Sequence, residues 1–156
     1  MRLTIQIKTS VVMIFMLAVV CVFGNRAESQ QKLQVQQEGR IFTAMNMKIN
    51  DVPVYVEWED NESAKALREG LPLIVKMSMY GGFEQVGSLG RNLPRNDKRI
   101  TTHAGDIVLY SGNQIVLFYG ANTWAYNKLG RITGKTQSEL ADLLGKSDAV
   151  LTLSAE

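Results

Sequence analysis

The sequence predicts a mainly β fold, a closed antiparallel barrel of about eight strands with two short helices. From residue 45 onward, short runs of alternating or continuously apolar residues recur, and turn-forming residues separate them. Apolar residues at helical spacing occur in one early and one late segment. Many short strands with few helices are typical of a sheet that closes on itself, because closure leaves no unpaired edge.

The first 24 residues are typical of a signal peptide. Arg2 and Lys8 precede the uninterrupted apolar stretch Val11–Phe23, which suits a signal-peptide core and falls short of the roughly 20 residues that span a bilayer. A buried core helix is the alternative, and it is disfavoured because the stretch has no polar face. We therefore predict export, to the periplasm or outside the cell.

Cleavage is expected after Gly24 or Ala27, because the peptidase prefers a small residue there. It would remove Cys21, the single cysteine of the chain, and with it any disulfide, thiol catalysis or thiolate metal site. A lipoprotein with lipidated Cys21 is the alternative, and the bulky Val20 before it argues against this. Membrane contact is expected only through such a lipid or an uncleaved signal.

Residues 25–43 are predicted to form a flexible linker rich in Gln, and residues 44–156 to form the folded domain. Without Arg2 and Lys8, 15 basic residues face 15 acidic ones, and no block of Lys or Arg remains. A neutral domain of this kind has no electrostatic footprint for nucleic acid. We therefore exclude nucleic acid as a partner.

The domain begins with a predicted β-hairpin. Met45–Ile49 alternates apolar and polar residues, an Asn-Asp pair marks the turn, and Val52–Trp58 returns with its apolar residues on one face. A short helix follows, capped at its start by the Asp60-Asn61 pair and ended by Gly70.

The middle of the domain is predicted to hold four strands. Leu73–Met79 and Glu84–Ser88 are joined by a Tyr-Gly-Gly turn, and the polar segment Gly90–Thr101 after them is expected to be a surface loop. Ile107–Tyr110 and Ile115–Tyr119 are apolar on both faces, which is typical of central strands.

The last part adds a strand at Lys128–Ile132 and a helix at Ser138–Leu144. Thr136 or Ser138 is expected to cap this helix, and Gly145 to end it. Ala149–Leu153 is the final predicted strand.

His103, the single histidine, has two interpretations. It is either a general base oriented by Asp106, favoured by an ordinary pKa near 6.5, or a turn residue whose ring holds the local backbone. Gly105 and Asp106 fit a tight turn before a strand better than a catalytic pair, so the turn role is favoured. Without a second histidine or a compact carboxylate cluster, we expect no catalytic residue, no metal and no cofactor.

Aromatic residues are the better candidates for ligand binding. Tyr80, Tyr119, Trp124 and Tyr126 are expected at strand ends or in loops. There they would line one shallow groove, since Trp and Tyr offer a large apolar face with a polar tip. In the alternative interpretation Tyr119 and Trp124 fill the interior of the barrel.

The order of motifs after residue 102 resembles the carboxy-terminal half of cyclophilins. "HAGDIVLYSGNQIVLFYG" is followed by "TWAYNKLGRI", "SELADLLG" and "AVLTLS". Over about residues 45–153 the chain is similar to the bacterial cyclophilin-like proteins, which are compact eight-stranded barrels. The resemblance implies a ligand groove in which Trp124 is the pocket tryptophan and Val116 and Phe118 form an apolar wall.

The chain departs from the isomerising cyclophilins at their active residues. Met77–Leu89 contains no arginine where the family has a Phe-His-Arg strand, and the Gln-Gly-Gly-Asp segment is missing. That guanidinium is thought to weaken amide resonance, against a barrier of about 18 to 20 kcal/mol. We therefore expect a module that binds a peptide or small ligand without catalysis. A prolyl isomerase or folding helper of the cell envelope is the alternative, and an accessory partner of a redox or flavin protein is a third hypothesis.

The signal-peptide interpretation predicts that the mature chain begins at Asn25 or Glu28. Mass spectrometry of the exported protein checks this, and an intact Met1 would refute cleavage. As a control, Leu17→Arg interrupts the apolar core and should leave the precursor uncleaved.

Overall fold

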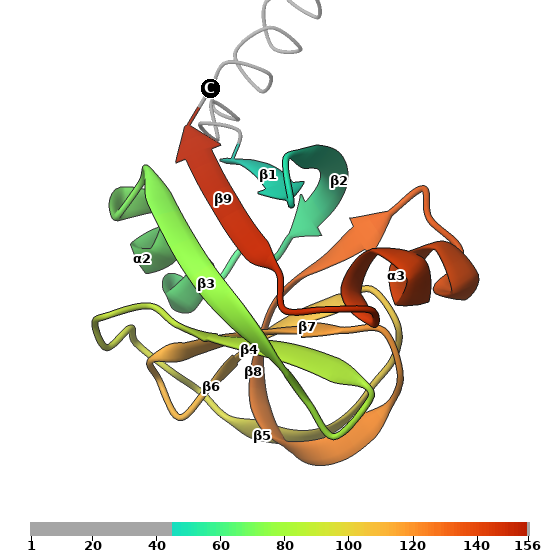
Figure 1. The fold of residues 1–156 in the computed structure, drawn as a ribbon. Coiled ribbons are helices and arrows are strands. Elements are labelled where there is room, and N and C mark those ends of the chain that lie inside the picture. The colour runs from blue at the N-terminus through green and yellow to red at the C-terminus, as the bar shows by residue number, and fades with distance from the viewer. Residues whose placement is uncertain (1–44, 156) are drawn as a thin grey trace, which may run out of the picture. The chain divides into compact units, whose positions relative to one another are not determined.

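The computed structural model describes residues 45–155 of the 156-residue chain. The predicted signal peptide and linker lie outside the described residues. Within them the fold is mainly β, as predicted, with nine strands and two helices (Figure 1). In chain order these are β1 Met45–Ile49, β2 Val52–Trp58, α2 Glu62–Glu69, β3 Leu73–Tyr80, β4 Glu84–Ser88, β5 Lys98–Thr102, β6 Asp106–Tyr110, β7 Gln114–Phe118, β8 Asn122–Thr133, α3 Gln137–Leu144 and β9 Val150–Ala155.

The strands form one sheet in the order β2-β1-β9-β3-β4-β7-β6-β8-β5, and β2 also pairs with β8. All these pairings are antiparallel. Strand β8 is the longest of the described strands, and Figure 1 shows it as a curved orange ribbon. Its second half pairs with β2 and β6, and its first half pairs with β5.

The prediction of about eight strands is wrong by one, because part of the expected loop Gly90–Thr101 is strand β5. Most of β5 is polar and exposed, so its side chains show no strand pattern. Its register partner is the first half of β8, which begins at Asn122 rather than at the predicted Lys128. Each of the two segments is a strand because the other supplies its hydrogen-bonding partners.

The predicted hairpin and the ends of both helices are confirmed. Asn50 and Asp51 both have positive φ, at 49° and 65°, as a tight two-residue hairpin turn requires. Asn61 caps α2, accepting a hydrogen bond from the amide of Ala64 at 2.9 Å, and Thr136 forms a capping box with Glu139 at the start of α3. Neither of these helices, the two among the described residues, is long and apolar enough to cross a membrane.

The central strands β6 and β7 are buried on both faces, as predicted, and separate two apolar clusters. On one face Ile107 and Leu117 belong to the larger cluster, which α2 and α3 also join through Leu67, Leu140 and Leu144. On the other face lies the smaller cluster, formed by Val108, Val116, Phe118 and Tyr126 with Phe83, Val86, Ile100 and Tyr110 packed against it. Strand β5 and the first half of β8 supply Ile100 and Tyr126, so they partly cover this second face.

Candidate functional site

A cavity of about 460 Å³ lies over the smaller cluster. Strands β3, β4, β6 and β7 contribute to its lining, and the first half of β8 completes it. The lining is rich in aromatic side chains and contains one carboxyl group. The nine lining residues are Tyr80, Glu84, Val86, Tyr110, Gln114, Val116, Asn122, Trp124 and Tyr126.

Four of the six binding residues predicted from the sequence, Tyr80, Val116, Trp124 and Tyr126, line this cavity. Tyr80 and Trp124 are 67% and 53% exposed, so they lie at its rim, and Trp124 does not fill the interior of the sheet. Val116 is fully buried at the cavity floor.

The remaining two predicted residues, Phe118 and Tyr119, lie elsewhere. Phe118 is buried in the smaller cluster, edge-on to the ring of Tyr126 at 5.6 Å between centroids. Tyr119 belongs to the larger cluster and is not among the lining residues. Neighbouring positions at the end of a strand point to opposite faces, so the two rings cannot share one groove.

The aromatic wall on β8 is held by hydrogen bonds. Tyr126, expected at a strand end or in a loop, lies inside strand β8 and is 5% exposed. Its hydroxyl accepts a hydrogen bond from the Asn122 side-chain nitrogen at 3.0 Å. Asn122 is held in turn by Thr102 of β5, whose hydroxyl bonds to both backbone polar groups of Asn122 at 3.0 and 3.2 Å. Burial raises the pKa of Tyr126, and the nearby Glu84 carboxylate adds to the rise.

Sequence reasoning missed five of the nine lining residues, namely Glu84, Val86, Tyr110, Gln114 and Asn122, and Glu84 is the charged one among them. Its side chain is 6% exposed, and its Oε2 atom is buried without a hydrogen-bond partner within residues 45–155. Burial raises the pKa of this carboxyl from 4.5 to about 7. The available signal was the alternation of the "EQVGS" strand, which puts Glu84 on the same face as Val86.

The neighbour Gln85 shows that the opposite face of β4 has a structural role. Its side-chain nitrogen donates to the carbonyl oxygens of Leu144 at 2.6 Å and Ser147 at 2.7 Å. These bonds attach the end of α3 to the sheet. Glu84 Oε2 and Gln85 Oε1 are both buried without a hydrogen-bond partner within residues 45–155. Gln85 is fully buried and faces the structural side of the strand, whereas Glu84 is 6% exposed and lines the cavity.

A second hollow, of about 660 Å³, is lined mainly by polar residues around the start of α2, in and before β5, and in the middle of β8. Its carboxylates have partners: Asp60 and Glu62 lie 3.4 and 3.3 Å from Lys65, and Glu59 lies 3.7 Å from Lys128. Exposed pairs of this kind are common on protein surfaces and indicate no ligand. The smaller, aromatic cavity is therefore the better candidate site.

Residues 47–154 match the family model described as the cyclophilin-like family. The chain belongs to the cyclophilin-like family. This agrees with the resemblance found in the sequence. A search of curated proteins found no match to the chain.

Two solved structures share the fold of this cyclophilin-like domain. The structure of McbB in complex with tryptophan is 11% identical, with a TM-score of 0.55 over 72% of this chain and 45% of that chain. The solution structure of the hypothetical protein AF2241 from Archaeoglobus fulgidus is 19% identical, with a TM-score of 0.53 over 72% of this chain and 93% of that chain. The present chain thus spans less than half of McbB, and at these identities the likeness concerns the fold alone.

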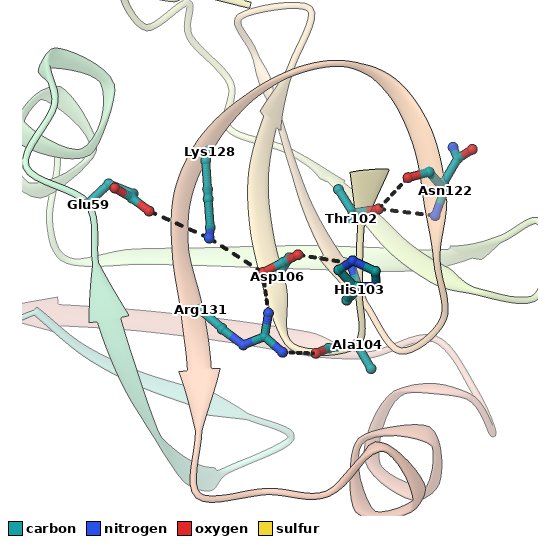
Figure 2. Close-up of polar contacts among 8 residues, drawn as sticks. All are labelled: Glu59, Thr102, His103, Ala104, Asp106, Asn122, Lys128 and Arg131. Atoms are coloured by element: carbon teal, nitrogen blue, oxygen red, sulfur yellow. Dashed lines mark hydrogen bonds and ion pairs between the residues drawn. The ribbon is translucent and has the colours of Figure 1, made fainter. Parts of the chain in front are cut away.

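His103 lies outside the cavity lining of the cyclophilin-like domain, in an exposed turn before β6 (Figure 2). The sequence favoured a turn in which the imidazole ring of His103 holds the local backbone. In the structure its backbone amide donates to Asp106 Oδ2 at 2.8 Å, and Asp106 Oδ1 pairs with Arg131 at 3.0 Å. Gly105 has a φ of +93°, which favours glycine. Asp106 therefore organises this turn through the backbone.

No group of three His, Cys, Asp or Glu side chains among the described residues is arranged to hold a metal ion.

Asp106→Ala should lower the free energy of unfolding by about 1 to 3 kcal/mol, because it removes the buried carboxylate that accepts from the His103 amide and pairs with Arg131. His103→Ala should change it by less than about 0.5 kcal/mol, since that side chain is exposed. Urea unfolding of both variants measures the difference. Equal losses would show that the imidazole holds the turn.

The raised pKa of Glu84 predicts a pH-dependent stability difference between wild type and Glu84→Gln. The folded-state pKa of about 7 lies above the ordinary 4.5. Ionisation of Glu84 therefore leaves the free energy of unfolding unchanged below pH 4.5 and lowers it progressively as the pH rises through 7. Glu84→Gln should therefore match the wild type near pH 4 and exceed its stability near pH 8 by up to about 3 kcal/mol. Urea unfolding at both pH values tests this.

Glu139→Gln serves as the control with the opposite sign. The Thr136 backbone amide, and then its hydroxyl, lowers the pKa of Glu139, so the ionised form stabilises the helix and this stability is lost as pH falls through the lowered pKa. This variant should be less stable than the wild type at pH 8. If Glu84→Gln is also less stable than the wild type at pH 8, burial of the ionised Glu84 carboxyl does not destabilise the fold, and the prediction is wrong.

Proposed function

We propose that this cyclophilin-like domain binds a small ligand or a peptide segment in the cavity around Glu84. The observation that carries the proposal is the buried carboxyl group of Glu84 in the lining of an aromatic cavity, with one oxygen unpartnered within residues 45–155. Leaving a buried polar group without a partner costs about 1 to 3 kcal/mol, so such a group calls for an explanation, and a bound ligand would supply one. The volume of about 460 Å³ is within the range of small-molecule sites.

The exposed rim supports binding at the same place. Tyr80 and Trp124 are two of the large apolar side chains that the described surface exposes, and both border the cavity. Aromatic residues around a buried polar group are typical of recognition sites, because the rings supply contact area at a small entropic cost. They are attached to opposite walls, Tyr80 at the end of β3 and Trp124 on β8.

The proposal includes a closed barrel. Strand β2 pairs with β8 over four residue pairs, from Tyr55 with Thr133 to Trp58 with Gly130, which supports closure of the ring by eight of the strands. A closed sheet would hold the cavity walls rigid, as a preformed binding site requires. Export through residues 1–24 would place the site in the periplasm or outside the cell, and the proposal includes no metal or cofactor.

Prolyl isomerisation is the weaker hypothesis, because none of the nine residues that line the cavity is an arginine. Arg91, the arginine nearest in sequence to β4, donates instead to the carbonyl oxygen of Ala66 on α2, at 2.6 Å. The isomerising cyclophilins are thought to weaken the prolyl amide with a guanidinium group, and the nine lining residues supply none. Binding and isomerisation should therefore be separable.

A proline-containing peptide should bind without a catalysed isomerisation. Its titration should shift the Trp124 indole NMR signal, while the Trp58 signal stays fixed because that indole donates to the Met45 carbonyl oxygen at 3.0 Å in the hairpin. In a parallel assay the isomerisation rate should stay near the uncatalysed rate. A rate approaching that of an isomerase, abolished by replacing Arg91 or Arg99, would overturn the binding-module proposal.

A further inference from the structure

We propose that the natural ligand of this cavity carries an organic ammonium group, which the Glu84 carboxylate and the surrounding aromatic rings hold together. This inference rests on the proposed function and adds the chemical class of the ligand. It is carried by the charge of the cavity, by its unused hydrogen-bond acceptor and by the kind of side chain around that acceptor.

The charge of the lining is complementary to a cation. Glu84 is the single acidic residue among the nine lining residues, and none of the nine is Lys, Arg or His. An anionic ligand would meet a carboxyl group with no cation beside it, whereas an ammonium group would neutralise it. Charge-assisted hydrogen bonds of this type are about twice as strong as neutral ones.

The hydrogen-bonding state of Glu84 also favours a donor. A carboxylate only accepts hydrogen bonds, and Oε2 has no donor within residues 45–155. An ammonium group offers up to three N–H donors at one point. The other polar side chains of the lining, among them Gln114 and Asn122, are neutral, so the Glu84 carboxylate is the one charged acceptor there.

The aromatic side chains favour a cation over a neutral donor. Four of the nine lining residues are aromatic, and they come from three strands: Tyr80, Tyr110, Trp124 and Tyr126. The rings of Tyr110 and Tyr126 lie edge to face, 5.9 Å apart at an angle of 65°. Ring faces attract an ammonium group within about 6 Å by about 0.5 to 2 kcal/mol. Val86 and Val116 offer an apolar surface to the carbon skeleton of such a ligand.

The pH dependence of binding separates an amine from a neutral ligand. The other titratable groups that line the cavity are the phenols of Tyr80 on β3, Tyr110 on β6 and Tyr126 on β8. β4 contributes Glu84 itself and Val86, and β7 contributes Gln114 and Val116. An ammonium ligand needs ionised Glu84, so its affinity should rise with pH up to about 7. A peptide carbonyl would need the protonated acid, and its affinity would fall.

The test compares three probes of one shape: benzylammonium, benzyl alcohol and phenylacetate. Each is titrated into the purified protein at pH 5.5 and pH 8, and the Trp124 indole NMR signal reports binding while Trp58 serves as the internal reference. Benzylammonium should bind with a Kd at least tenfold lower than that of benzyl alcohol at pH 8. Its Kd should rise by about tenfold for each pH unit below 7. Phenylacetate should bind most weakly.

Variants assign the effect to Glu84. Glu84→Gln should remove the preference for benzylammonium and its pH dependence, while its unfolding curve shows that the protein remains folded. Trp124→Leu, at an exposed rim position, should weaken benzylammonium binding without loss of stability, and the Tyr126 ring signals then replace Trp124 as the reporter. The control Glu69→Gln removes an exposed carboxylate on α2 and should change nothing.

The outcomes distinguish the two proposals. If benzyl alcohol or the proline peptide binds at this site as tightly as benzylammonium, the ammonium inference fails and the binding function stands. If the affinity for benzylammonium is unchanged in Glu84→Gln, the inference fails as well. If none of the three probes and no peptide shifts the signals of the cavity residues, both proposals fail.

Discussion

Strand β8 is hydrogen-bonded to three other strands, and both apolar clusters depend on those pairings. In the second half of β8, the register with β6 shifts between Ile107 and Val108. An irregularity of this kind bends a strand and increases its twist. Gly130 lies at this point and faces β2, where an added Cβ would lie 2.7 Å from the Glu57 carbonyl oxygen. A residue without a side chain therefore lets β2 and β6 pair with the same stretch of β8.

The bend determines where the first half of β8 goes. Instead of extending the ladder with β6, this half pairs with β5, and the two together lie over one face of β6 and β7. An open sheet would expose that face to water, and Val108 and Phe118 would then be solvent-exposed rather than buried. The smaller cluster and the cavity beside it are thus consequences of one curved strand.

Burial beneath β5 and the first half of β8 also changes the pKa of Glu84. On a solvated sheet face its carboxyl would titrate near the ordinary value for glutamate, whereas beside Phe118 and Val86 it loses hydration and its pKa rises to about 7. The larger cluster on the other face of the sheet stabilises the fold, so the protein stays folded despite the free-energy cost of burying this carboxyl group. The fold is that of the cyclophilin-like family, and under our proposal the side chains in its cavity determine the ligand. Here those side chains are tyrosines, a tryptophan and a glutamate.

Some elements could be predicted from the sequence, because their own residues carry the signal. The alternation and the Asn-Asp turn predicted the hairpin of β1 and β2, the Asn61 cap predicted the start of α2, and the double apolar pattern predicted the burial of β6 and β7. It also identified Trp124 and Val116 as cavity residues through the resemblance to cyclophilins.

The remaining features depend on contacts between segments that are far apart in the chain. Lys98–Thr102 and the first half of β8 are strands because each supplies hydrogen-bond partners to the other, which no pattern of side chains along one segment reveals. Phe118 and Tyr119 separate because the strand alternates faces, and only the sheet shows what each face contacts. The importance of Glu84 was hidden for the same reason. A glutamate in a strand is ordinary when it faces water, and its burial depends on a segment of β8 about 40 residues further along the chain.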